Sequence, residues 1–107
     1  MSGSGGGGGG GPDGPVLACE DLVIRAQIAS PKAAVVSKLK VGDALDVEVQ
    51  TIGGTAVVML LSRGKLAGGL AAPNLSRLRE CIEGGTTYQA TIAAISGAQI
   101  NVTVEAL

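Results

Sequence analysis

The chain has 107 residues, 46% of them hydrophobic, and a formal net charge of −1. It has no His, Phe or Trp and a single aromatic residue, Tyr88, which excludes His-based catalysis, His metal sites and stacking platforms for bases or sugars. Eight Lys and Arg face nine Asp and Glu, so no overall positive field draws the chain to nucleic acid or anionic lipid.

Residues 1–15 (MSGSGGGGGGGPDGP) are too rich in glycine to join a packed core. We expect a flexible, disordered leader, either a natural tail or an artificial linker, followed by a single small domain over residues 16–107. No basic stretch precedes an apolar one, and no apolar run approaches about 18 residues. We therefore expect neither a signal peptide nor a membrane span, and predict a cytoplasmic protein.

The two cysteines, Cys19 and Cys81, form no CxxC motif, which argues against a zinc site. For a cytoplasmic protein we expect both thiols to be reduced, with a Cys19–Cys81 disulfide as the less favoured alternative. Cys81 lies on the apolar stripe of a predicted helix, so we interpret it as a small core residue.

The first predicted elements are a strand and a short helix. Apolar and polar residues alternate over residues 21–28, which is typical of a strand with one buried face. Ser30-Pro31 is a helix-start signal, so a two-turn helix is expected over residues 32–39.

Three further strands are predicted in the middle of the chain. Residues 44–50 alternate cleanly, with Asp46 and Glu48 facing solvent. A Gly53-Gly54 turn leads into residues 55–62, a continuous apolar run that predicts a central strand buried on both faces. Residues 66–70 follow as a short strand, in which the pair Gly68-Gly69 indicates a bulge or a close backbone approach.

The last elements are a second helix and a hairpin. Asn74 is a good N-cap for a helix through residue 83, and Gly84-Gly85 ends it. Two strands over residues 87–95 and 98–105 join at a Ser-Gly turn. This order predicts a mainly β fold: a small, mostly antiparallel barrel or curled sheet of five to six strands, with two short helices at its ends.

Basic residues near glycines and a helix start form the strongest candidate site. Arg63 and Lys65 precede Gly68 and Gly69, and Asn74 opens the following helix, an arrangement suited to an anion. Arg77 on that helix and Tyr88 on the next strand complete the candidate set. We expect the Tyr88 ring in the core or at its rim, with its hydroxyl reaching solvent. The alternative for the basic residues is ordinary solvated turns. No catalytic constellation, metal site or cofactor is predicted.

Several short motifs resemble the HIRAN domain, a small β-barrel found in helicase-like and repair proteins. They are VGDALDV from Val41, GKLAGGL from Gly64, the helix start NLSRL and the segment GGTTYQA from Gly84, together spanning about residues 41–92. The resemblance implies a barrel fold and binding of single-stranded DNA ends, with Lys65, Arg77 and Tyr88 carried over. The aromatic residue that the family has after its second motif is replaced here by Gly69-Leu70.

These observations favour a non-catalytic binding module over an enzyme. The first hypothesis is protein–protein contact or self-association, because a mean hydropathy of +0.42 is high for so small a chain. The second is a nucleic-acid-binding barrel acting through a local basic patch that includes Arg63, Lys65 and Arg77.

Overall fold

The computed structural model describes residues 18–72 and 75–107. The leader predicted for residues 1–15 and the predicted N-cap Asn74 lie outside the described residues.

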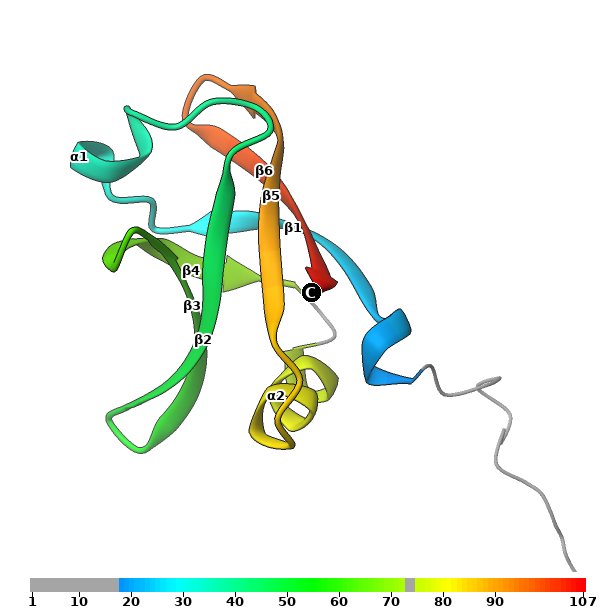
Figure 1. The fold of residues 1–107 in the computed structure, drawn as a ribbon. Coiled ribbons are helices and arrows are strands. Elements are labelled where there is room, and N and C mark those ends of the chain that lie inside the picture. Colours follow the sequence, from blue (N-terminus) through cyan, green and yellow to red (C-terminus); the bar gives the residue numbers. More distant parts are fainter. Residues whose placement is uncertain (1–17, 73–74) are drawn as a thin grey trace, which may run out of the picture.

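Six strands form one closed barrel in which every neighbouring pair is antiparallel (Figure 1). Around the barrel the order is β1-β4-β3-β2-β5-β6, and β6 pairs again with β1. The strands are β1 (Val23–Ala29), β2 (Ala44–Ile52), β3 (Thr55–Ser62), β4 (Lys65–Ala71), β5 (Tyr88–Ser96) and β6 (Gln99–Ala106). The predicted mainly β, antiparallel barrel is confirmed.

β1 closes the barrel because it pairs with strands on both of its sides. Gln27 lies opposite Ala71 of β4 and also opposite Asn101 of β6. Closure leaves no long row of unpaired backbone groups, which an open sheet of this size would expose.

The core follows the period-two alternation of the strands. In β2, Leu45 and Val47 point inward and are buried, whereas Asp46 and Glu48 are exposed, as predicted. Among the described residues the buried side chains are all hydrophobic: Leu22, Ile24, Ile28, Leu45, Val47, Val58, Leu60, Ala67, Leu70, Leu78, Cys81, Tyr88, Ala90, Ile92, Ile100, Val102 and Val104.

β3 differs from its prediction on its outer face. Val58 and Leu60 are buried inside the barrel, but the outward residues Val57, Met59 and Leu61 are only half-buried. The continuous apolar run therefore combines a core face with a half-buried apolar outer face, which periodicity alone does not distinguish from burial on both sides.

The predicted irregularity at Gly68-Gly69 is confirmed as a register shift between β3 and β4. Leu60 pairs with Gly68 whereas Leu61 pairs with Leu66, so one additional residue is accommodated in β4. Gly68 is there for two reasons: its φ is +156°, and a Cβ on it would clash with Ile28 Cγ2 and lie 2.8 Å from the Ala29 carbonyl oxygen.

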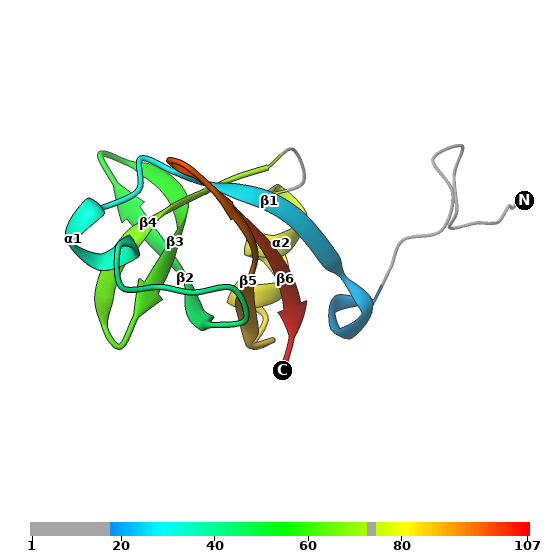
Figure 2. The same cartoon turned by 90° about the horizontal axis from the view of Figure 1, so that it is seen from above.

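The helices lie at opposite ends of the barrel (Figures 1 and 2). α2 (Leu75–Glu83) buries Leu78 and Cys81, whereas α1 (Ala33–Val36) is a single turn with no buried residue. The predicted two-turn helix over residues 32–39 and its Ser30 cap are therefore wrong. Ser30 has a φ of +49°, and Lys32 at the N-cap position makes no side-chain cap. A short 3-10 turn, η2 (Cys19–Asp21), precedes β1.

The two neighbouring glycines of β4 are expected to respond differently to alanine. Gly68→Ala combines a backbone conformation that alanine rarely adopts with a steric clash, and we expect a loss of about 2–4 kcal/mol in the free energy of unfolding. Gly69→Ala meets only contacts of 3.7 Å or more and is expected to change stability by less than about 1 kcal/mol. Urea denaturation of both variants checks this, and equal losses would contradict it.

Candidate functional site

A basic pocket lies between α1 and the β3–β4 turn. Its volume is about 430 Å³, and Lys38, Arg63 and Lys65 line it. Apolar side chains, including Val35 and Leu39, form much of the remaining wall. We call this site the basic pocket.

Local backbone geometry places its cations. Arg63 and Gly64 have φ values of +53° and +81°, which makes the tight β3–β4 turn and sets Arg63 and Lys65 on either side of it. Lys38 comes from the segment that follows α1, 25 positions before Arg63 in sequence (63 − 38). The pocket therefore joins two parts of the chain that are separate in sequence.

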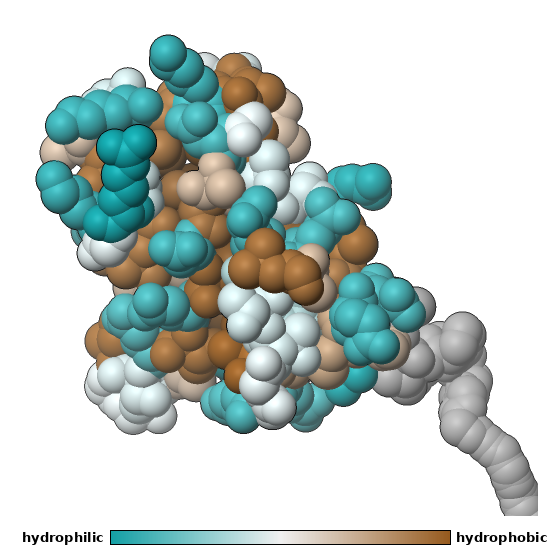
Figure 3. Space-filling model, viewed as in Figure 1, coloured by the Kyte–Doolittle hydropathy of each residue, from teal (hydrophilic) through white to brown (hydrophobic). Residues whose placement is uncertain are grey.

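The charge around the pocket is positive. Among the described residues, Asp43 is the one carboxylate that lines it, and its Oδ2 accepts a hydrogen bond from the backbone N–H of Lys40 at 2.9 Å. Three cations and one carboxylate give a local formal charge of +2 (3 − 1). Hydrophilic side chains gather over this end of the molecule in Figure 3, beside α1. Within the described residues, no ion pair engages Lys38, Arg63 or Lys65.

The structure does not bring the predicted site residues together. Arg63 and Lys65 share the basic pocket, but Gly68 and Gly69 line a second groove. Arg77 and Tyr88 lie near α2, and Asn74 lies outside the described residues. Lys38 was missed as a site residue, because its proximity to Arg63 arises only when α1 packs beside the β3–β4 turn.

The second groove lies on the outer side of β3 and β4 and is mainly apolar. It has a volume of about 320 Å³, and we call it the outer groove. Its lining includes Ile52, Met59, Leu66, Gly69 and Leu75, with Lys32. The two pockets have no lining residue in common.

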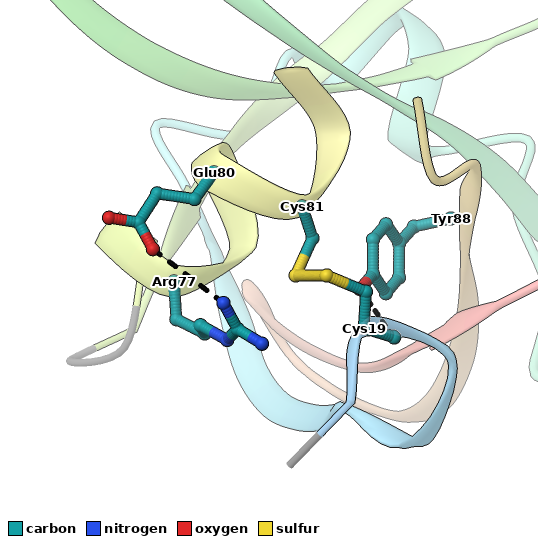
Figure 4. The surroundings of a disulfide bond; sticks show 5 residues. All are labelled: Cys19, Arg77, Glu80, Cys81 and Tyr88. Atoms are coloured by element: carbon teal, nitrogen blue, oxygen red, sulfur yellow. Dashed lines mark hydrogen bonds and ion pairs between the residues drawn. A yellow bond between two sulfur atoms is a disulfide. The ribbon is translucent and has the colours of Figure 1, made fainter. Parts of the chain in front are cut away.

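Tyr88 is a core residue, and the expectation that its hydroxyl reaches solvent is wrong. The residue is 2% exposed, and its O–H donates a hydrogen bond of 2.5 Å to the carbonyl oxygen of Cys19 (Figure 4). Burial raises the pKa of the phenol above its ordinary value of 10.0, with Arg77 lowering that pKa and Glu20 raising it to smaller extents.

A disulfide joins Cys19 to Cys81, so the expectation of two reduced thiols is corrected. It links η2 to the buried face of α2 across 62 positions of sequence, with a Cα–Cα distance of 5.5 Å (Figure 4). Disulfides persist mainly in oxidising compartments. The reduced thiols were expected as a consequence of the predicted cytoplasmic location, and that location stays a prediction.

Comparison with known proteins identifies no relative of this chain: no family model, curated protein or solved structure matches it. Within residues 18–72 and 75–107, no helix has the length and apolarity that crossing a membrane requires.

Replacing Tyr88 by phenylalanine is expected to cost about 1 kcal/mol of stability, because the Cys19 carbonyl loses one of its two donors and keeps only the Leu22 N–H. The variant also tests the titration of the phenol. With a raised pKa in the folded state, Tyr88 stabilises the protein fully below pH about 10, and this contribution declines as pH rises above that value. In the Tyr88→Phe variant, the free energy of unfolding measured by chemical denaturation should not show that decline at alkaline pH. An unchanged alkaline profile would contradict the assignment.

Removing the disulfide is expected to lower the free energy of unfolding by about 2–4 kcal/mol, since the unfolded chain gains conformational freedom. Urea denaturation with and without a reductant measures this. The double variant Cys19→Ala and Cys81→Ala is the control, because its stability should not respond to reductant. Free thiols in the purified, unreduced protein would overturn the pairing.

Proposed function

We propose that this barrel is a binding module whose ligand is a single strand of nucleic acid, held by its phosphates at the basic pocket. The observation that carries the proposal is the convergence of Lys38, Arg63 and Lys65 from two separate segments on one recess. A chain with a net charge of −1 does not attract nucleic acid as a whole, but a local cluster of cations does.

The form of the pocket supports a flexible strand as the ligand. A recess of about 430 Å³ has the size of small-ligand sites and suits one nucleotide or a strand end better than the broad face of a duplex. Val35 and Leu39 offer an apolar wall against which a sugar or base packs. Contacts to phosphate position a strand without reading its sequence, so we propose binding with little sequence preference.

The resemblance to the HIRAN domain stays a proposal, and the residues that it carries over coincide only in part with the basic pocket. Of the three residues that the resemblance carries over, Lys65 lines the basic pocket. Tyr88 is buried and bonded to Cys19, and Arg77 lies on α2 within 3.7 Å of Glu80. The proposal therefore depends on Lys65 with Lys38 and Arg63, and assigns no role in binding to Tyr88.

Binding should depend strongly on salt and on the pocket cations. Three phosphate contacts predict a slope of about −2 for log affinity against log salt concentration. Lys65→Glu should weaken binding of a labelled deoxythymidine oligonucleotide and make that slope shallower by roughly 0.7 or more. Fluorescence anisotropy over a salt series measures both.

Arg25→Glu is the matched control. Arg25 is exposed on the outer face of β1 and does not line the pocket, yet the substitution changes net charge by the same amount. Equal effects of the two variants would show attraction to overall charge and not to the pocket. Absence of binding by the wild-type protein at low salt would overturn the proposed function.

A further inference from the structure

We propose that the protein forms a two-fold symmetric dimer through the outer groove, with Met59 of each copy entering the groove over Gly69 of the other. This proposal concerns a different face from the basic pocket and does not depend on nucleic-acid binding. It assigns a partner to the protein–protein interaction predicted from the sequence.

Gly69 lies at a position where the chain's own fold does not require glycine. A Cβ there would meet its nearest neighbour, the Val58 carbonyl oxygen, at 3.7 Å, which is ordinary contact. Its φ is not in the left-handed region, unlike that of Gly68 beside it. Glycine within a strand costs stability, and one common reason for it is the close approach of another chain or ligand.

The surroundings of Gly69 are suited to a protein surface. Along β3 and β4 the outward residues Val57, Met59, Leu66 and Ala71 are all apolar, and Ile52 at the end of β2 is 54% exposed. Elsewhere around the barrel the outward positions are mixed: the row formed by Thr91 and Thr103 is polar, whereas Val23 on β1 and Ile95 on β5 are exposed singly. Apolar surface gathered on one side of a small domain indicates a contact face.

The pairing of Met59 with Gly69 makes this face complementary to itself. The two residues lie directly opposite each other in the β3–β4 ladder, so a flexible apolar side chain stands next to a position without one. A two-fold axis between them places each Met59 over the partner's Gly69. Two-fold interfaces require this reciprocity, in which one residue contacts a second and the second contacts the first.

Opposite charges lie at the two edges of this face, where the same two-fold axis would pair them. Across the barrel the order is Ala29 on β1, Gly69 on β4, Met59 on β3 and Glu48 on β2. Lys32 lies at the β1 edge, where its backbone N–H donates to the Ala67 carbonyl oxygen of β4 at 2.8 Å and its residue lines the groove. The same two-fold axis brings Lys32 of one copy toward Glu48 of the other, which favours a second copy over an unrelated apolar partner.

Sedimentation velocity of the full chain over a concentration series tests the proposal. We expect the wild-type protein to dimerise reversibly. Gly69→Val should raise the dissociation constant by roughly tenfold or more, since its branched side chain occupies the groove, while its Cβ meets nothing nearer than 3.7 Å in its own barrel. Thr103→Val, on the polar outer side of β6, is the control and should leave dimerisation unchanged. Circular dichroism verifies that both variants are folded.

Exchanging the edge charges gives the sharper test. Lys32→Glu and Glu48→Lys should each weaken the dimer, because each brings like charges together. The double variant should restore dimerisation, and a mixture of the two single variants should form a heterodimer. A wild-type protein that stays monomeric at all concentrations overturns the proposal. So does a dimer that responds neither to Gly69→Val nor to the charge exchanges.

Discussion

Closure of the sheet by β1 is the constraint on which the rest of the structure depends. This strand pairs with β4 on one side and β6 on the other, so it converts a six-stranded sheet into a barrel with a single interior. Aliphatic side chains fill that interior by alternation, and the buried set contains no charged or polar residue among those described. The consequence is that groups capable of binding lie on the outside and at the ends of the barrel.

The end of the barrel near α2 is held by a covalent link and by the one aromatic ring. The disulfide fixes η2 to α2, and Tyr88 bonds to the backbone of the same cysteine that forms the disulfide. These interactions compensate for a small core that is poor in aromatic residues, because small domains often need a cross-link in addition to apolar burial. They also give the buried phenol a structural role.

The opposite end and one side of the barrel carry the two proposed binding surfaces. The basic pocket forms where α1 approaches the β3–β4 turn, whereas the outer groove lies on β3 and β4 themselves. The two surfaces are separate in lining and opposite in character, one cationic and one apolar. The two proposals are compatible with each other, since neither proposed site occupies the other.

Alternation along the strands determined the fold class and the inward residues of β2, because both depend on neighbours close in sequence. The pair Gly68-Gly69 indicated the irregularity in β4, but the close approach of Ile28 and Ala29 to Gly68 is a tertiary contact. The outer exposure of β3, the shortness of α1 and the pairing of Cys19 with Cys81 depended on contacts between distant segments, which no local pattern encodes. The same holds for the candidate site. Arg63 and Lys65 could be predicted as neighbours because they belong to one turn, whereas Lys38 joins them only through packing. Tyr88 and Arg77 lie near α2, away from the basic pocket. Local backbone preferences are written in the sequence, but which side chains meet is decided by the closing of the barrel.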